Sequence, residues 1–167
     1  SAGAFADEMQ NMREDARELA EQQQQIAEQM EALEEGGEKS LRDVREKDRL
    51  AEQLQEQQDK LDDVLKQVRE VSQAAETGEP LLSKQLYDTL RDTEQKQPQQ
   101  ALDAARQLMQ RGWSEQASRA ERQARDSIEQ LKSDVERAAE SVLGNETEAL
   151  KRARQELADL AQQLNQE

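Results

Sequence analysis

Any acid–base chemistry in this sequence would have to rest on carboxylates, lysines or a lone tyrosine. The 167 residues include 38 aspartates and glutamates, a single tyrosine, and no histidine or cysteine. Without cysteine there can be no disulfide, thiolate zinc site or cysteine nucleophile, and without histidine the commonest general base and metal ligand is missing. We therefore predict that the protein has no catalytic residues, is not an enzyme, and binds no cofactor or metal.

Two groups of acidic residues come closest to a site. Glu34, Glu35 and Glu38 flank a pair of glycines, but they lack the alternating Asp and Asn ligands of a calcium-binding EF-hand loop. Asp62 and Asp63 are neighbours on a predicted helix, where successive side chains diverge by about 100°, so they do not converge on one substrate. Both groups are interpreted as solvated surface.

Trp113 and Tyr87 are aromatic residues for which a functional role has to be weighed against packing. Trp113 is the only tryptophan and lies between Gly112 and Ser114, at a predicted corner between two helices. We expect its ring to cover the open end of a small bundle, because a thin core depends on the buried area of its few large side chains. The alternative is that Trp113 is an exposed anchor for a partner. Tyr87 is expected to pack on an apolar helix face with its hydroxyl at the rim.

Arg119, Arg122 and Arg125 recur every three residues on one predicted helix. The ordinary interpretation is ion pairing within the helix, which contributes about 0.2–0.5 kcal/mol per pair. A sharper hypothesis is that this row faces an acidic surface, because residues 1–76 carry a net charge of −11 and residues 77–167 only −4. Nucleic-acid binding is not expected, since phosphate contacts need an attractive field and the whole chain has a net charge of −15.

Met9, Met12 and Met30 share one predicted helix seam. Methionine is flexible and polarizable, and it adapts to partners of varied shape. These three residues therefore motivate an alternative function, in which a helical module binds unfolded clients as a holdase does.

The composition is typical of long helices. Charged residues make up 37% of the chain and aromatic residues 2%, which is also compatible with disorder. However, apolar residues recur at alternating spacings of three and four along most of the chain, and this periodicity favours amphipathic helices. No stretch approaches the roughly 18 consecutive apolar residues of a transmembrane helix, so we expect no direct membrane insertion by this segment.

A first heptad stripe runs from Ala2 to Leu33 and has Gln23 at its one polar position. Gly36 and Gly37 are expected to end this helix, because glycine readily takes the left-handed conformation found at helix C-termini.

A second stripe runs from Val44 to Ala75, and Ser40 with Asp43 resembles a capping box at its start. Two helices of nearly equal length joined by a short glycine turn predict a long antiparallel coiled-coil hairpin over residues 1–76. Because Gln23 weakens the first seam, a homodimer in which the heptad seams pair between two chains is the alternative.

Residues 77–167 are predicted to form a second domain, a compact helical bundle of about four helices. Pro80 and Pro98 suit the first turns of two of them. Gly112 ends the second, and Ser114 can cap a third that runs to Gly144.

Gly144 is expected to end the third of these helices, and Asn145 with Glu148 resembles a capping box for a last one. The last helix carries an apolar stripe that we expect to face the bundle: Leu150, Ala153, Leu157, Leu160 and Leu164.

Residues 81–164 resemble the helical C-terminal region of large, membrane-anchored, coiled-coil-rich bacterial proteins of unknown function. The similarity lies in "KQLYDTLR", "RGWSEQA", "SIEQLK" and "ERAAESVLGNETEALKRA". This resemblance implies a membrane-proximal scaffold of the cell envelope, and it carries over no functional residues. The start "SAGAFADEMQ" and the end "LAQQLNQE" indicate a segment of a larger protein.

The sequence therefore predicts an all-α protein, with a long antiparallel coiled-coil hairpin followed by a compact helical bundle. Its predicted function is that of a structural and protein-interaction scaffold module. Recognition would act through heptad seams, with charge setting specificity and register. The expected partner is another protein.

Overall fold

The computed structural model describes residues 3–36 and 41–166, and within them the chain consists of helices joined by turns, with no strand, which confirms the predicted all-α class. It forms five helices over these ranges: α1 (Ala6–Glu35), α2 (Leu41–Ala74), α3 (Pro80–Lys96), α4 (Pro98–Gln110) and α5 (Ser114–Gln166). Pro80 and Pro98 each occupy the first turn of a helix, as predicted, where the missing N–H of proline costs nothing.

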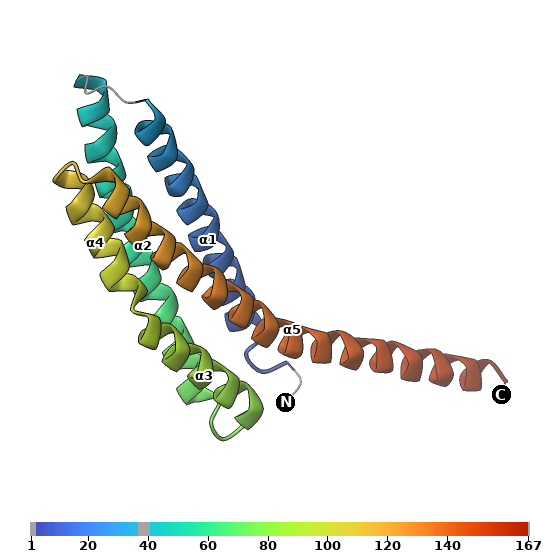
Figure 1. The fold of residues 1–167 in the computed structure, drawn as a ribbon. Helices are drawn as coiled ribbons and strands as arrows, with labels where there is room; N and C mark the ends of the chain where they lie inside the picture. Colours follow the sequence, from blue (N-terminus) through green and yellow to red (C-terminus); the bar gives the residue numbers. More distant parts are fainter. Residues whose placement is uncertain (1–2, 37–40, 167) are drawn as a thin grey trace.

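The helices pack as one bundle from which half of α5 projects (Figure 1). α1 and α2 run antiparallel, α5 lies along α1, and α3 and α4 lie along α2 while also contacting α5. The predicted domain boundary at residues 76–77 falls in the turn between α2 and α3. Helices from both sides of that boundary share one apolar core.

The core is built from the predicted heptad seams. Residues from all five helices are buried in one cluster, and its largest fully enclosed apolar side chains are Met9, Met12, Leu19, Leu54, Leu61, Val68, Leu86, Leu102, Ile128 and Leu131. The seams of α1 and α2 therefore contact α3, α4 and α5 as well as each other, since α5 packs along α1 and α4 along α2.

The prediction of a helix end at Gly144 was wrong, and so was the capping box at Asn145 and Glu148. α5 runs without a break from Ser114 to Gln166, so the two predicted helices are one. A glycine inside a helix costs only about 1 kcal/mol relative to alanine. The Ala, Glu, Leu, Lys and Arg residues on both sides of Gly144 are good helix formers that offset this cost.

The last apolar stripe does not face the bundle as expected. Residues 147–166 of α5, hereafter the arm, project away from the other helices (Figure 1), and every described side chain in them is exposed. The four leucines of the stripe are 58% (Leu150), 67% (Leu157), 55% (Leu160) and 72% (Leu164) exposed.

Three smaller expectations also need correction at the ends of α1 and α2. α1 begins at Ala6, because Phe5 has a left-handed backbone (φ 70°). α1 ends at Glu35, directly before Gly36, as predicted, but Gly36 keeps a right-handed conformation (φ −70°). Gly37 and Ser40 lie outside the described residues. Val44, predicted to lie on the α2 seam, is 53% exposed.

Candidate functional site

Three polar side chains meet inside the bundle and form a polar layer, Gln23 of α1, Gln57 of α2 and Glu121 of α5. All three are buried. The side-chain amide of Gln23 donates to Glu121 Oε2 at 2.9 Å, and Gln57 Nε2 donates to Gln23 Oε1 at 3.0 Å and to the Leu19 carbonyl at 2.9 Å. Because buried polar groups cost free energy unless they are paired, these hydrogen bonds fix how the three helices align.

The polar layer contains one buried carboxylate. Burial raises the pKa of Glu121, while the hydrogen bond from Gln23 and the charges of Arg125 and Arg122 act in the opposite direction. Arg125 Nη2 lies 3.6 Å from Glu121 Oε1. Burial has the largest effect on this pKa, so the Glu121 carboxyl is harder to ionise in the folded protein than in water.

The sequence carries a signal for this layer, of which the predicted seams include only Gln23. At this level of the bundle a polar residue interrupts each of the three seams: Gln23 between Leu19 and Ile26, Gln57 between Leu54 and Leu61, and Glu121 between Ala117 and Ala124. Only Gln23 was recognised as a seam position. Long polar side chains in the seams of three packed helices favour a shared polar layer, since each can be a hydrogen-bond partner for the others.

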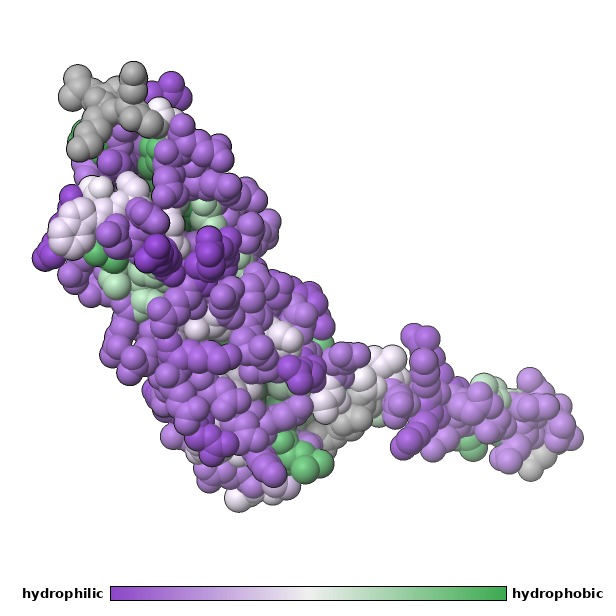
Figure 2. Space-filling model, viewed as in Figure 1, coloured by the Kyte–Doolittle hydropathy of each residue, from purple (hydrophilic) through white to green (hydrophobic). Residues whose placement is uncertain are grey.

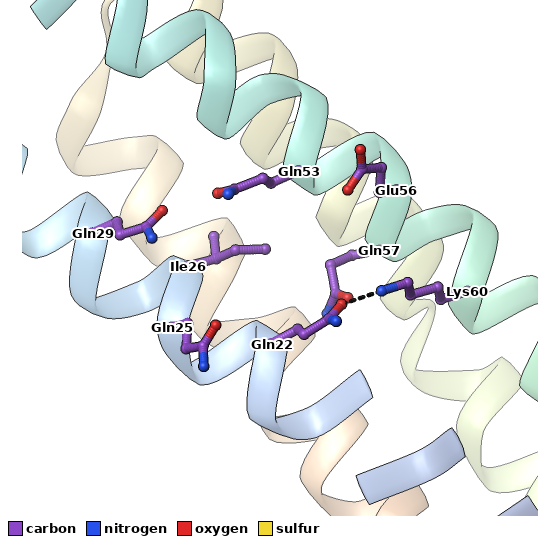
Figure 3. Close-up of a pocket in the computed structure, with 8 residues that line it drawn as sticks. All are labelled: Gln22, Gln25, Ile26, Gln29, Gln53, Glu56, Gln57 and Lys60. Carbon is purple, nitrogen blue, oxygen red and sulfur yellow. Dashed lines mark hydrogen bonds between the residues drawn. The ribbon is translucent and has the colours of Figure 1, made fainter. Parts of the chain in front are cut away.

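A polar groove lies between α1 and α2 beside this layer (Figure 3). It has a volume of about 170 Å³ and is lined by Gln22, Gln25, Ile26, Gln29, Gln53, Glu56, Gln57 and Lys60. The glutamines of α1 face those of α2 across it, and Lys60 donates to Gln22 Oε1. The groove holds one carboxylate and one ammonium group among amides, a lining that differs from the mostly apolar lining of small-molecule sites.

The acidic turn after α1, considered above as a metal site, lies partly outside the described residues. In the described ranges 3–36 and 41–166 no group of three or more acidic side chains is placed to hold a metal ion. Glu34 accepts a hydrogen bond from Ser118 Oγ at 3.3 Å, which joins the end of α1 to α5. Glu38 lies outside the described residues.

Trp113 does not close the bundle as expected, because its side chain is 52% exposed. It follows Gly112 (φ 81°) in a Schellman motif at the end of α4, where the Trp113 N–H bonds to the Leu108 carbonyl and the Gly112 N–H to that of Met109. In this motif the residue after the glycine is commonly apolar. The Arg111 guanidinium lies 5.7 Å from the ring centroid, a cation–π distance.

Two of the three arginines in the row form ion pairs within their own helix, as the ordinary interpretation predicts. Arg119 pairs with Glu115 at 3.1 Å and Arg125 with Glu121 at 3.6 Å, both within α5. Arg122 is exposed. An ion pair also links α1 to α5, but here the basic residue belongs to α1: Arg17 Nε lies 2.8 Å from Glu136 Oε1 of α5.

Met9, Met12 and Met30 are buried in the shared core, with exposures of 0%, 0% and 4%. An unfolded client could contact them only if α1 separated from α2 and α5. Their adaptable side chains fill the irregular spaces between the helices in this arrangement, which is the usual role of methionine in a core.

Tyr87 packs at the rim of the bundle as predicted. Its side chain is 37% exposed, and its hydroxyl donates a 2.7 Å hydrogen bond to Glu76 Oε1. That bond raises the pKa of Tyr87. The contact ties α3 to the turn that follows α2.

The arm is the described feature most suited to contact with another molecule. Figure 2 shows it standing clear of the bundle. The sequence spacing of its leucines, that of a heptad seam, puts them on one face of the helix. The leucines of the arm were expected to lie in the core. The sequence therefore predicted their heptad face correctly but not its exposure to solvent.

Within the described helices, none is long and apolar enough to cross a membrane. Comparison with protein-family models, curated proteins and solved structures gives no match.

Proposed function

We propose that the chain is a structural and protein-interaction scaffold module, in which a helical bundle holds out the arm as a docking helix. The row of exposed leucines from Leu150 to Leu164 carries this proposal. Exposed apolar surface of this extent on a soluble protein usually marks an interaction site. Most of the stability of a helix in a protein comes from packing of its amphipathic face, so a partner would also stabilise the arm.

Two features of the bundle support its role as a rigid base. α5 is continuous from the core into the arm, so the packing of Ile128 and Leu131 in the bundle sets the direction in which the arm leaves it. Hydrogen bonds between side chains also hold α2 to its neighbours, including Gln67 to Asp15 of α1 at 2.8 Å. We further propose that α1 and α2 pack as an antiparallel coiled-coil hairpin, the spine of this base.

The energy available at the arm suits a reversible contact. Full burial of a leucine side chain contributes about 1.5–3 kcal/mol, so burying the exposed parts of four leucines would contribute roughly 4–8 kcal/mol per arm. Association itself costs an estimated 4–15 kcal/mol. The arm therefore supports regulated or multivalent assembly better than a permanent complex.

The proposed setting is the cell envelope of a bacterium, where the module would be one part of a larger membrane-proximal scaffold. This part of the proposal is supported by the resemblance of residues 81–164 to membrane-anchored bacterial proteins. The role is non-catalytic, in keeping with a sequence that lacks histidine and cysteine, and it involves protein rather than nucleic acid because the chain is strongly acidic.

Site-directed photocrosslinking in cells that express the chain tests this function. Benzoylphenylalanine placed at Leu157, on the leucine face, should give protein adducts on irradiation. The same group at Gln155, on the opposite face of the arm, is the matched control and should give few. If neither position forms adducts under any growth condition, the arm is not a docking helix and the proposed function is wrong.

A further inference from the structure

The apolar face of the arm has the width of a coiled-coil seam. Leu150, Ala153, Leu157, Leu160 and Leu164 follow alternating spacings of three and four residues, so they occupy heptad positions a, d, a, d and a. Core-facing helices of globular proteins usually carry a broader stripe, with further apolar residues at e or g. In the arm the only apolar residues at these flanking positions are the small Ala149 at g and Ala161 at e. Such a narrow seam matches a single helix with the same repeat.

The charges beside the seam differ in sign on its two sides. Arg154 occupies position e on one side, and Glu156 occupies position g on the other. When two such helices pair in parallel, the e side of each helix faces the g side of the other. On both sides of the pair, the flank that carries Arg154 therefore lies along the partner's flank that carries Glu156. Turning one helix end for end would instead bring like flanks together. Charges at e and g set partner choice and orientation in coiled coils.

The arm is also the part of the chain that a second copy can approach without repulsion. Residues 147–166 carry three basic and three acidic side chains, so they are neutral, whereas the whole chain has a net charge of −15. Two acidic bundles repel each other, but this repulsion is screened beyond about 8–10 Å at physiological salt. The neutral arms extend beyond the bundle surface (Figure 1).

We propose that the arm binds the arm of a second copy of this chain, as a short parallel coiled coil joined along the seam from Leu150 to Leu164. The inference rests on the proposed function, because it names the partner of the docking helix. It places self-association in the arm, whereas the seams of α1 and α2 are buried within each chain.

Sedimentation equilibrium of the full chain tests the pairing over roughly 10 μM to 1 mM, a range that covers weak association. We expect a reversible monomer–dimer equilibrium that strengthens with salt, as screening relieves repulsion between the bundles. The variant L157Q/L160Q should weaken dimerisation at least tenfold. The matched control A158Q/N165Q adds glutamines outside the seam and should dimerise like the unmodified chain. A chain that stays monomeric throughout, or equal dimerisation by both variants, overturns the proposal.

Charge reversal tests the orientation. In a parallel pair, R154E and E156R should each weaken the dimer several-fold, because each single change puts like charges on facing flanks. The double variant R154E/E156R should restore it, since the two signs are exchanged together. An antiparallel pair predicts little effect of either single change on the homodimer, and that result would overturn the parallel arrangement.

The photocrosslinking at Leu157 separates failure of this inference from failure of the proposed function. Adducts of twice the chain mass support pairing of two arms. Adducts formed with a different protein alone, together with a monomeric chain in solution, would keep the docking function and overturn self-pairing. Circular dichroism at micromolar concentration should show that every arm variant keeps the folded bundle, because the substituted side chains are exposed.

Discussion

Gln23 Nε2 donates a 2.9 Å hydrogen bond to Glu121 Oε2 across the contact between α1 and α5, inside the core of the bundle. The two residues are 98 positions apart in the sequence and are 0% and 3% exposed. Gln57 of α2 joins them through Gln23 Oε1. The three helices therefore share one layer of long polar side chains inside the core, and shifting any helix along its axis would leave a buried amide or carboxylate without its partner.

Substituting Glu121 by glutamine should change stability in a pH-dependent way. Burial raises the pKa of Glu121 above its ordinary value of 4.5, so ionisation is less favourable in the folded than in the unfolded chain. The unmodified protein therefore loses stability as the pH rises from the ordinary pKa through the folded pKa, and this loss is constant above that range. E121Q cannot ionise, so its free energy of unfolding should rise relative to the unmodified protein over the same range.

Urea denaturation of both proteins at pH 4 and pH 7 measures this difference. Other carboxylates titrate equally in the two proteins, so their contributions cancel in the comparison. We expect E121Q to be relatively more stable at pH 7 than at pH 4. An identical difference at both pH values would show that Glu121 has no raised pKa in the fold.

Replacing Gln23 by leucine should destabilise the bundle by about 1–3 kcal/mol, because Glu121 would lose its buried hydrogen-bond donor. Replacing the whole layer, as in Q23L/Q57L/E121L, should recover most of this loss, since an apolar layer of similar volume leaves no polar group unpaired. Denaturation midpoints at pH 7 measure both. A triple variant that is less stable than Q23L would mean that the layer stabilises the fold beyond the pairing of its own members.

The sequence predicted most of the fold because the heptad repeat is a local signal. The seams through Met9, Leu54 and Ile128 are buried as expected, and Pro80 and Pro98 start helices. The prediction failed at Gly144, where the local cost of glycine was taken as decisive although good helix formers surround it. It also failed for Leu157, because an apolar stripe shows which face needs a partner and not whether that partner belongs to the same chain.

Trp113 should behave as an exposed fluorophore. It is the only tryptophan in the chain, and half of its side chain is exposed, so its emission reports on this corner alone. We expect efficient quenching by acrylamide in the folded protein. W113A should cost less than the roughly 3–5 kcal/mol that truncation of a fully buried tryptophan costs.

A blue-shifted, weakly quenched emission at low chain concentration would show that the ring is buried in solution. Quenching that decreases as the chain concentration rises, and that L157Q/L160Q does not alter, would place Trp113 in a separate interface. R111Q removes the guanidinium beside the ring and serves as a control. A cation–π contact at an exposed site contributes about 0.5–1 kcal/mol.

Glycine-to-alanine substitutions should distinguish the two glycines that flank the predicted helix of residues 114–144. Gly112 has φ 81° and no neighbouring atom within 4 Å of an added Cβ, so G112A meets only backbone strain. The left-handed conformation costs about 1–2 kcal/mol for a residue with a Cβ, and the denaturation midpoint should fall accordingly.

Gly144 has a helical backbone and equally open surroundings, so G144A should favour the helix by about 0.5–1 kcal/mol. The arm beyond it makes little contact with the bundle, and this gain should therefore appear as local rather than global stability. We expect an almost unchanged denaturation midpoint but a roughly two- to fivefold slower hydrogen exchange of amides just after position 144. If G144A instead accelerated exchange there, the helix would be interrupted at Gly144 in solution, and the arm would be a separate element joined by a hinge.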